Sequence, residues 1–383
     1  MPSSARDATT AVVPAAPGMS DSPATSGRAD GAALVAVSKE ADDYSRSVDG
    51  VALEAIRTGD GSGLSTVQAT RVRDVIANSN TVGFPMAVYG TIGDDRVLAA
   101  AVRRAPSGAR WCGIDISSGM VVIYGPGAEH TGANPAGLEF SFALVKADHL
   151  EERAGKLGMP LRIPDRGQVH ALHPSAESGA LHETLCGIGE MAALGVSPAL
   201  VEGAVVNDVI AALQDDRRIQ RIGARKAIDS RIVTRVCIDY AESIGRIPTV
   251  DELCQGAHVS ERRLRTAFND VYGMPPVRFF RAWGLNLARQ LLLGADPRRG
   301  DNVTTIALKA GFRHLGRFAG TYRVAFGESP SATLAVPARS TALSHGRASL
   351  AHGSRSRGRT TARFTPPDQV DAVRTNTNSA VAG

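Results

Sequence analysis

Two stretches of this chain decide its fold: residues 248–273 have the sequence PTVDELCQGAHVSERRLRTAFNDVYG, and residues 302–327 have NVTTIALKAGFRHLGRFAGTYRVAFG. In each, a short segment with apolar residues at helical spacing meets a tight turn, and a second helical segment with arginines ends at glycine. This succession predicts a helix-turn-helix, whose second helix enters the major groove of DNA. Two such units, about fifty residues apart, predict a protein that binds DNA at specific sequences.

The ends of the predicted helices carry capping residues. Thr249 is expected to cap the first short helix, Ser260 the helix that runs to Tyr272, and Asn302 the first helix of the second unit. Apolar residues at helical spacing are expected to form the two cores. They are Leu264, Phe268 and Val271 in the first unit and Ile306, Ala307, Ala310, Phe312, Phe318, Tyr322 and Phe326 in the second.

Two longer helices are expected around these units. Residues 227–244 are amphipathic, with Ile232, Val236 and Ala241 on the inner face. After the Met-Pro-Pro at residues 274–276, a long helix would hold the two units about one helical turn of DNA apart. Its apolar stripe is Val277, Phe280, Trp283, Leu287 and Leu291.

Together, residues 248–330 resemble the DNA-binding domain of the AraC/XylS family of bacterial transcription regulators. The run IALKAGF…F…YRVAFGESP matches the most diagnostic signature of that family. The matching residues are Ala307, Gly311, Phe312, Phe318, Phe326, Gly327 and Pro330. The resemblance implies a domain of seven helices whose two helix-turn-helix units bind successive segments of the major groove.

The resemblance also assigns DNA contacts. The positions that contact bases correspond to Arg262, Arg265 and Thr266 in the first unit and to Leu315, Gly316, Arg317 and Gly320 in the second. In the second unit only the arginine has a polar side chain long enough to reach a base edge. We therefore expect the first unit to supply most direct readout and the second to position the protein on phosphates. The full set of expected contacts is Ser260, Arg262, Arg263, Arg265, Thr266, His314, Leu315, Gly316, Arg317, Gly320 and Arg323.

The N-terminal half begins with short β-branched and aromatic runs, between residues 82 and 145, separated by Gly- and Pro-containing turns. This pattern predicts an antiparallel barrel or sandwich, and the helical segments after Lys146 are expected to pack on it or to form a dimer contact. The order of strands and then helices resembles the cupin-like sensory domains of many AraC-family regulators. That resemblance implies a small-molecule effector in the barrel, lined by Trp111, Tyr124, Phe140 and Phe142, although aromatic residues on strands are also ordinary core.

Metal ligation and cysteine chemistry are not expected. Glu129, His130 and Glu139 lie near one another in sequence without a His-x-His pair, and we expect the histidines, including His170 and His173, in exposed loops. No cofactor is therefore expected. Cys186 and Cys254 lie in apolar helical segments, where inert buried thiols are more common than redox sensors.

Composition limits the class of protein. The net charge of +5 and the pI of about 9.2 are compatible with nucleic acid, and 43% hydrophobic residues fit a globular fold. No apolar run is long enough to span a membrane, no secretory leader is evident, and four scattered cysteines favour a reducing cytoplasm. The expected organisation is a disordered segment (1–45), a cupin-like sensory and dimerisation domain (46–215), a linker (216–226), the double helix-turn-helix domain (227–336) and a disordered basic tail (337–383).

These patterns predict an α+β multidomain protein and a sequence-specific transcription regulator, an activator more than a repressor. Double-stranded DNA, RNA polymerase, a second copy of the chain and an unidentified effector are the expected partners. No catalytic residues are expected. Two alternatives stay open: a cupin-type or cysteine-based enzyme fused to a DNA-binding domain, and an architectural protein that binds DNA non-specifically through its basic tail.

Overall fold

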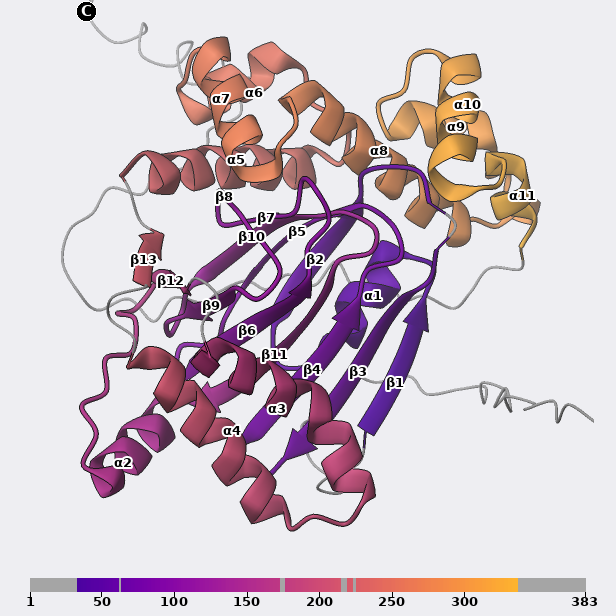
Figure 1. The fold of residues 1–383 in the computed structure, drawn as a ribbon. Helices are drawn as coiled ribbons and strands as arrows, with labels where there is room; N and C mark the ends of the chain where they lie inside the picture. Colours follow the sequence, from indigo (N-terminus) through magenta and orange to yellow (C-terminus); the bar gives the residue numbers. More distant parts are fainter. Residues whose placement is uncertain (1–32, 62, 173–175, 215–218, 223–224, 337–383) are drawn as a thin grey trace, which may run out of the picture.

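The computed structural model describes residues 33–61, 63–172, 176–214, 219–222 and 225–336 (Figure 1). Most of the expected disordered N-terminal segment, and the whole expected basic tail, lie outside this described part. The described chain forms an N-terminal domain of strands and helices and a C-terminal domain of helices only.

The described strands of the N-terminal domain pair antiparallel in two sheets. The large sheet has the order β1 (Ala33–Ser38), β3 (Ser65–Val72), β4 (Val75–Thr81), β11 (Glu139–Lys146), β6 (Arg96–Arg104), β9 (Val121–Tyr124), β12 (Val169–Leu172) and β13 (Ile219–Ile222). The small sheet has the order β2 (Ala52–Arg57), β5 (Met86–Thr91), β10 (Glu129–Asn134), β7 (Arg110–Trp111) and β8 (Ile114–Asp115).

The two sheets face each other across an apolar core. Along β11, Phe142 and Leu144 belong to this core, whereas Ala143 and Val145 belong to the apolar cluster on the opposite face of the large sheet. Side chains alternate between the faces of a strand, so this strand is buried on both sides. The expected antiparallel barrel or sandwich with helices is confirmed.

Helices cover the outer face of the large sheet (Figure 1). They are α2 (Ala147–Leu157), α3 (Ala176–Ala193) and α4 (Pro198–Leu213). Val205 and Val209 of α4 share one apolar cluster with Ala99 and Ile123 of the sheet, which shows that the broad apolar stripe of this helix packs on strands. The described residues contain no helix that is both long and apolar enough to cross a membrane.

The expectation of a disordered segment up to residue 45 is wrong for its last residues. Residues 33–38 form β1, which pairs with β3 at the edge of the large sheet. The helix α1 (Ala41–Ser47) then buries Ala41 and Tyr44 in the core between the sheets. The backbone pairing of a sheet edge and the buried Ala41 and Tyr44 hold in place a segment that its composition alone describes as polar.

The expected linker is also partly structured. Residues 219–222 form β13, which pairs with β12 at the other edge of the large sheet. The first helix of the C-terminal domain, α5 (Arg225–Ile244), starts within the range assigned to the linker. A charged segment can form an edge strand because the pairing uses backbone groups.

Within residues 225–336 the structure contains seven α-helices, as the resemblance implied. They are α5, α6 (Val250–Ala257), α7 (Glu261–Tyr272), α8 (Pro276–Leu293), α9 (Val303–Lys309), α10 (Leu315–Phe326) and α11 (Pro330–Ala335), with a 3₁₀ turn at Pro297–Arg299. The first half of α8 contributes Phe279 and Phe280 to the core of the first unit, and its second half contributes Leu285 and Leu292 to the core of the second.

Two apolar residues assigned to inner faces are exposed. Ile232 on α5 is 55% exposed and Val277 on α8 is 62% exposed. The inner face of α5 uses the neighbouring Val233 instead, and Val277 lies in the first turn of its helix, beyond the core formed by Phe280 and its neighbours. Periodicity found the helices but placed these two positions on the wrong side.

Candidate nucleic-acid interface and ligand cavity

Two caps set the geometry of the first helix-turn-helix unit, α6 and α7. The Thr249 hydroxyl accepts a hydrogen bond from the Glu252 amide (3.2 Å), and the Glu252 carboxylate accepts one from the Thr249 amide (2.7 Å), which is a capping box. Arg246 donates to the same carboxylate (2.6 Å), and this bond is the main reason why the pKa of Glu252 falls to about 2. Ser260 caps α7 by accepting from the Arg263 amide (3.3 Å). Both expected caps are confirmed.

The outward face of α7 presents Arg262 and Arg265, which are exposed. Arg265 forms an ion pair with Glu261 one turn earlier (2.8 Å), and both of these side chains are more than half exposed. Thr266 donates its hydroxyl to the Arg262 carbonyl (2.9 Å). The structure thus brings together the three residues that the resemblance assigned to base contacts in this unit.

Arg263 points away from this face. Its guanidinium donates to the Ser230 hydroxyl of α5 (3.2 Å), and that hydroxyl donates to the Asp270 carboxylate (3.1 Å). The side chain therefore ties α7 to α5. Among the expected DNA contacts in this helix, it is the residue that the structure separates from the others.

The second unit, α9 and α10, has the same order of elements. Asn302 caps α9 by accepting from the Thr305 amide (2.9 Å), as expected. In the turn, Gly311 has φ of +96°, and a Cβ at this position would lie 2.9 Å from the Ile247 amide nitrogen. Only glycine fits both conditions without strain. Phe318 is buried inside the unit.

The outward face of α10 differs from that of α7. Leu315, Gly316, Arg317, Gly320 and Arg323 are all exposed, and His314 lies at the N-cap position without a side-chain cap bond. A Cβ at either exposed glycine would meet nothing within 4 Å, so packing inside the protein does not require glycine there. This face carries two arginines around an otherwise small and uncharged surface.

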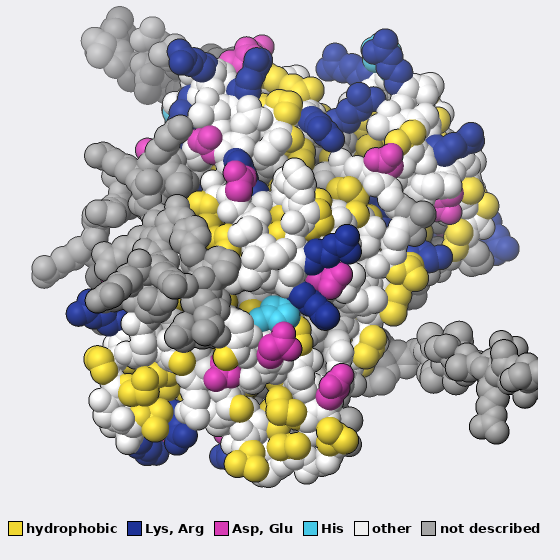
Figure 2. Space-filling model, in the orientation of Figure 1, with side chains coloured by type: hydrophobic (Ala, Val, Ile, Leu, Met, Phe, Trp, Pro, Cys, Tyr) yellow, Lys and Arg dark blue, Asp and Glu magenta, His cyan; other side chains and the backbone are white. Residues whose placement is uncertain are grey.

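Basic side chains gather along the edge of the molecule that the C-terminal helices form (Figure 2). The exposed basic residues from α7 to α10 include Arg262, Arg265, Arg278, Arg281, Lys309, Arg313, Arg317 and Arg323. Arg281 of α8 donates to the Thr321 hydroxyl of α10 (2.8 Å), which adds a polar contact between the two units. Because α8 contributes to both cores, it holds the two units at one spacing.

The first unit is seated on the small sheet by apolar packing. Ile56 of β2 and Ala87 and Tyr89 of β5 belong to the same apolar cluster as Phe268 of α7. The Tyr89 hydroxyl donates to Glu242 of α5 (2.7 Å). The apolar core of the first helix-turn-helix unit is therefore continuous with the outer face of the small sheet.

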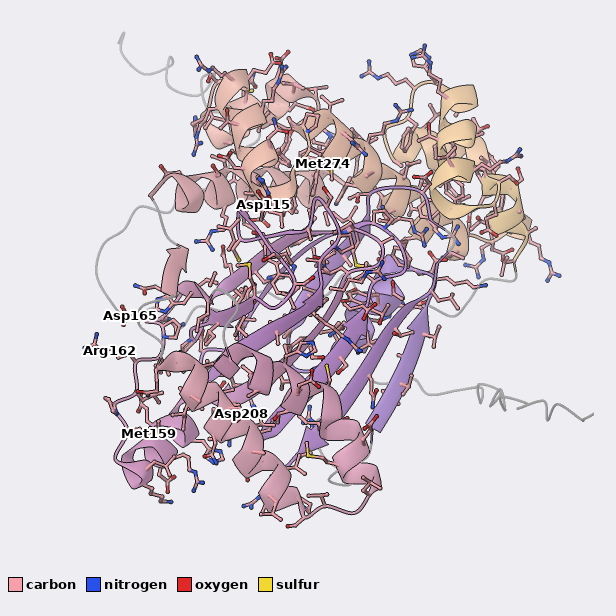
Figure 3. All side chains as sticks on the ribbon, in the orientation of Figure 1. Asp115, Met159, Arg162, Asp165, Asp208 and Met274 are labelled. Carbon is pink, nitrogen blue, oxygen red and sulfur yellow. The ribbon has the colours of Figure 1, made fainter. Side chains whose placement is uncertain are left out.

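A charged contact fixes the end of α7 on the same sheet. Arg110 of β7 donates to the carbonyls of Asn269 and Asp270 (3.0 Å each) and pairs with Asp115 of β8 (2.7 Å), which lies below the C-terminal helices in Figure 3. Carbonyls near the C-terminus of a helix lack partners within the helix, and a cation satisfies them well.

The second unit is seated by buried charge instead. Arg289 of α8 is 8% exposed and forms a two-bond ion pair with Glu40, which precedes α1 (2.5 Å for each bond). The same guanidinium donates to the Tyr322 hydroxyl (3.0 Å) of α10 and to the carboxylate of Glu328 (3.0 Å). One arginine therefore joins the N-terminal domain, α8 and the second unit.

A second polar contact lies beside it, at the edge of the small sheet. Asn286 of α8 accepts from the Arg57 amide (3.1 Å) and donates to the Arg57 carbonyl (2.9 Å). An edge strand leaves such backbone groups unpaired, and the side-chain amide satisfies both. The Arg57 guanidinium also donates to the Ala325 carbonyl of α10 (3.0 Å).

The core between the sheets holds a partly open cavity of about 50 Å³. All four aromatic residues predicted from the sequence line it, together with residues that the sequence did not single out, notably Tyr44, His130 and Asn134. The complete lining is Tyr44, Val48, Val51, Leu53, Val88, Ile92, Leu98, Ala100, Trp111, Tyr124, His130, Asn134, Phe140 and Phe142. None of these lining residues is acidic or carries lysine or arginine charge.

The polar atoms of the cavity wall are mostly paired with one another. The Trp111 indole donates to Asn134 (2.9 Å), and the Tyr124 hydroxyl lies 2.8 Å from His130 Nδ1. Burial lowers the pKa of His130 to about 4, so the imidazole is neutral near pH 7. Trp111 packs edge-on against Phe140, with ring centroids 5.1 Å apart. A molecule that fills this space meets flat apolar surfaces and neutral polar groups.

A smaller pocket lies between the small sheet and the C-terminal domain. It is lined by Tyr89, Gly90, Glu129, His130, Thr131, Arg231, Thr234, Arg235, Ile238 and Tyr272. His130 therefore lines both this pocket and the cavity. Tyr272 ends α7, so one histidine lies between the cavity and the helix with the exposed arginines.

The expectation of histidines in exposed loops is wrong for two of the three. His130 lies on β10 against the cavity and His170 is buried on β12, whereas His173 lies outside the described residues. Both histidines lie on strands that pair with segments distant in sequence, so no local pattern indicates that they lie inside the sandwich. Glu129, His130 and Glu139, which are near neighbours in sequence, are not among the described residues whose possible ligand atoms lie close together.

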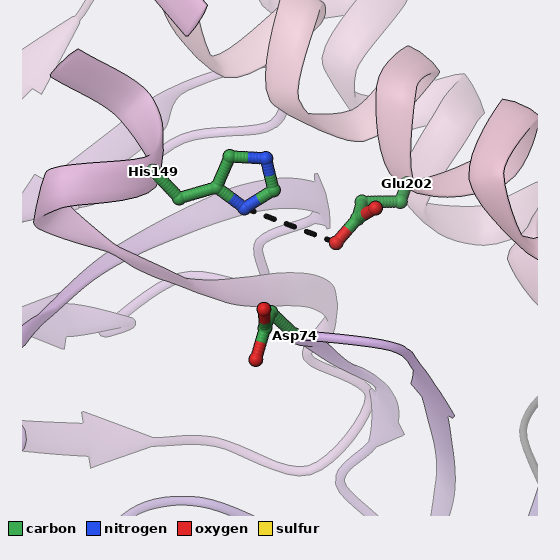
Figure 4. Close-up of side chains that lie close together, drawn as sticks. All are labelled: Asp74, His149 and Glu202. Carbon is green, nitrogen blue, oxygen red and sulfur yellow. Dashed lines mark ion pairs between the residues drawn. The ribbon is translucent and has the colours of Figure 1, made fainter. Parts of the chain in front are cut away.

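The described residues do bring Asp74, His149 and Glu202 together with ligand atoms within 4.8 Å of one another (Figure 4). His149 Nδ1 lies 3.8 Å from Glu202. Each carboxylate already has a cationic neighbour, since Lys146 pairs with Asp74 (3.0 Å) and Arg73 with Glu202 (3.3 Å). The hydrogen bond from Lys146 also lowers the pKa of Asp74. The charges of this cluster are balanced by protein side chains.

The two cysteines expected to be inert differ. Cys254 lies half-buried on α6, where burial raises the pKa of its thiol, in line with the expectation. Cys186 contacts His182 and Ser141, and the pKa of its thiol lies below the usual value. The apolar sequence around it did not reveal a partner from β11.

Sequence reasoning missed the residues that join the domains, above all Arg57, Asn286 and Arg289. On a helical wheel Arg289 lies opposite the apolar stripe predicted for α8, on the side where Leu285 and Leu292 are buried, so the periodicity gave no signal for it. Its partner Glu40 precedes it by 249 positions, which no local pattern connects.

Comparisons with known proteins fit this geometry. A family model described as a helix-turn-helix domain matches residues 253–335. The probable thc operon regulatory protein of Rhodococcus erythropolis is 35% identical over 137 residues, which are 35% of this chain and 40% of that protein. The XylDLEGF operon transcriptional activator 2 of Pseudomonas putida is 38% identical over 103 residues, which are 27% of this chain and 64% of that protein. This chain thus spans less than two thirds of either relative.

Among solved structures, the AraC-like transcriptional activator CuxR matches 66% of this chain and 94% of its own, with 13% identity and a TM-score of 0.36.

Proposed function

The C-terminal part of this chain belongs to the AraC type of helix-turn-helix domains, and from this premise we propose that the whole protein is a sequence-specific transcription regulator. Its two recognition helices, α7 and α10, would enter successive segments of the major groove. The observation that carries the proposal is the pair of similar units held at one spacing by α8, with exposed basic residues along the same edge of the molecule.

In this proposal α7 supplies most base contacts. Arg262 and Arg265 are exposed near the N-terminal end of the helix, the part that reaches base edges. The exposed ion pair between Arg265 and Glu261 contributes less than about 1 kcal/mol to stability. Arg265 can therefore leave Glu261 and donate two hydrogen bonds to a guanine at little cost. Arg263 supports this helix from behind through Ser230.

α10 would mainly bind phosphates. Because Gly316 and Gly320 have no side chains, the sugar-phosphate backbone can approach the outward face of α10 closely. Arg317 and Arg323 flank this surface, and Arg313 lies in the preceding turn. Ser260 and His314, at the N-termini of α7 and α10, are the remaining expected contacts, at positions suited to phosphate oxygens.

The cavity is proposed to bind a small, uncharged, largely apolar effector. Its lining offers no charged side chain to pair with a buried carboxylate or ammonium, and an unpaired buried charge is costly. Trp111, Tyr124, Phe140 and Phe142 would pack against the ligand. Since His130 also lines the pocket beneath Tyr272, an effector that displaces His130 would change how α7 is seated.

Activation, rather than repression, is proposed because the Pseudomonas putida relative is named as an activator. An activator of this kind would contact RNA polymerase in the cytoplasm. The helices of the N-terminal domain would provide the contact for a homodimer. Sedimentation of the purified protein with and without promoter DNA tests the dimer directly.

The deciding experiment is selection of genomic DNA fragments by the purified full-length protein at two salt concentrations, followed by sequencing. A recurring motif that spans two adjacent major-groove segments and persists at the higher salt supports the proposal. Fragments without a common sequence, lost together as salt rises, would favour an architectural DNA-binding protein. A chain without residues 338–383 is the control, because it keeps both helix-turn-helix units and removes the basic tail.

A further inference from the structure

Three polar side chains meet on the outer face of the large sheet, where α3 crosses β11 and β4 (Figure 1). Cys186 of α3 lies one turn after His182, with Sγ 3.6 Å from Nε2 and 3.8 Å from Nδ1. The Ser141 hydroxyl of β11 lies 3.3 Å from the same sulfur. The thiol is half-buried, and 13% of the His182 side chain is exposed, so the group lies close to solvent.

The hydrogen-bond directions favour a charged sulfur. Ser79 is the direct partner of Ser141 across the strand pair, and their hydroxyl oxygens are 3.0 Å apart. Ser79 can donate to Ser141 while Ser141 donates to sulfur. With the imidazole also donating, Cys186 receives two hydrogen bonds, an arrangement that suits a thiolate acceptor better than a thiol.

The electrostatic balance points the same way. Burial opposes the thiolate, but hydrogen bonds from His182 and Ser141, and the positive charges of His182 and Arg103 of β6, outweigh it and lower the pKa of Cys186. The bond to the sulfur raises the pKa of His182, which Glu183 also supports at 3.7 Å. The other cysteines with a shifted pKa, Cys237 and Cys254, are shifted upward by burial.

We propose that Cys186 and His182 form a thiolate–imidazolium pair that hydroperoxides oxidise, a modification site on the N-terminal domain separate from its cavity. Cys186 Sγ attacks the terminal oxygen of the hydroperoxide, an S–O bond forms and the O–O bond breaks. The sulfur is oxidised to a sulfenic acid and the peroxide is reduced to an alkoxide, or to hydroxide from hydrogen peroxide. His182 then gives its proton to that leaving oxygen.

The site lies directly behind the cavity wall. Ser141 is flanked in sequence by Phe140 and Phe142, whose side chains point to the opposite face of β11 and line the cavity. Ser141 Oγ lies 3.3 Å from the Cys186 sulfur, so oxidation of that sulfur changes a hydrogen bond to the strand that carries two aromatic residues of the cavity.

The test starts with alkylation of the full-length reduced protein by iodoacetamide at several pH values, with peptide mass mapping. Cys254 is an internal control because it is also half-buried. The thiolate is the form that reacts, and the pKa of Cys186 is lowered whereas that of Cys254 is raised, so Cys186 should react severalfold faster than Cys254 near pH 7. The variant His182→Gln should move the pH–rate profile of Cys186 to higher pH. Equal rates for the two cysteines, or an unchanged profile in His182→Gln, would overturn the proposal.

Oxidation itself is measured by adding hydrogen peroxide and trapping sulfenic acid with dimedone. Labelling of Cys186 before any other cysteine is the expected result, with slower labelling in His182→Gln. Ser141→Ala removes one hydrogen bond without touching the imidazole, so it should slow alkylation less and serves as a second variant if His182→Gln folds poorly. Labelling that is absent, or spread evenly over the cysteines, refutes a dedicated site.

Discussion

The two helix-turn-helix units share one order of elements but differ in what they expose and in what holds them. The first exposes Arg262 and Arg265 and rests on the small sheet through apolar packing and the partly exposed Arg110. The second exposes glycines and a leucine around two arginines and is joined to the N-terminal domain through the buried Arg289. Equal folds therefore do not imply equal roles, because the outward side chains are free to vary while the core positions are not.

The difference in seating has a mechanical consequence. Apolar packing depends on area and tolerates small shifts, whereas a buried ion pair depends on exact partners and loses stability sharply when one is removed. The first unit also lies next to the small pocket that shares His130 with the cavity. We therefore expect an effector to act on the first unit, with the second as a fixed anchor.

The largest effect should come from removing the buried ion pair between Arg289 and Glu40, which joins the second unit to the N-terminal domain. Arg289→Met leaves Glu40 without its two-bond partner in a buried site, so the free energy of unfolding should fall by about 3–5 kcal/mol. Urea denaturation measures it. Arg299→Ala is the control, because that side chain is 85% exposed and should change stability little. A loss below about 1 kcal/mol would mean that the second unit is held by its apolar core alone.

The next effect concerns His130, which lines the pocket next to the first unit, and is measured as the pH dependence of stability. The folded-state pKa of His130, about 4, lies below the usual histidine value, so the unfolded state binds more protons as pH falls below about 6.5. Stability is unaffected above that pH and should fall by roughly 2 kcal/mol on reaching pH 5. His130→Gln, which keeps an acceptor for Tyr124, should remove this part of the acid loss in urea titrations at pH 7 and 5.

His314→Gln, at the exposed start of α10 and outside the cavity lining, is the matched histidine substitution in the second unit. If the free energy of unfolding fell equally between pH 7 and pH 5 in His130→Gln and in the unaltered protein, the acid sensitivity would come from other groups. The prediction for His130, next to the first unit, would then be wrong.

A third pair of variants distinguishes base recognition by α7 from phosphate binding by α10. Arg262→Ala should reduce discrimination between the preferred sequence and its single-base variants by roughly 1–3 kcal/mol, because a bidentate contact to a base is lost. Arg317→Ala should weaken binding to all sequences about equally and reduce the salt dependence. Competition binding with a panel of single-base variants at two salt concentrations measures both. The reverse pattern would assign base readout to α10.

The smallest effect concerns the caps. Thr249→Ala removes the hydroxyl that accepts from the Glu252 amide and donates to the Glu252 carboxylate, which Arg246 also binds. Asn302→Ala removes the side chain that accepts from the Thr305 amide and hydroxyl and donates to the Gly300 carbonyl. Each should cost about 1 kcal/mol in thermal or urea unfolding. Because the carboxylate of Glu252 keeps its bond from Arg246, Thr249→Ala should cost no more than Asn302→Ala. A clearly larger cost for Thr249→Ala would show that the box acts as a unit.

The local features of the C-terminal domain were predictable because each depends on residues close in sequence. The caps at Thr249, Ser260 and Asn302 involve partners three positions away, and the core at Phe318 and Tyr322 follows helical spacing. The cavity aromatics could be named because alternation along strands is also local. Their assembly into one cavity with Tyr44 could not, since that residue comes from a segment whose composition suggests disorder.

The sequence by itself determined the two helix-turn-helix units, their caps, the β-sandwich in front of them and the exposed arginines of α7, because short-range periodicity encodes each of these. Only the tertiary structure decided that Glu40 meets Arg289, that His130 lies between the cavity and Tyr272, and that Ser141 turns towards Cys186. Such contacts join residues tens to hundreds of positions apart. They arise from the packing of whole sheets and helices, which no local pattern records.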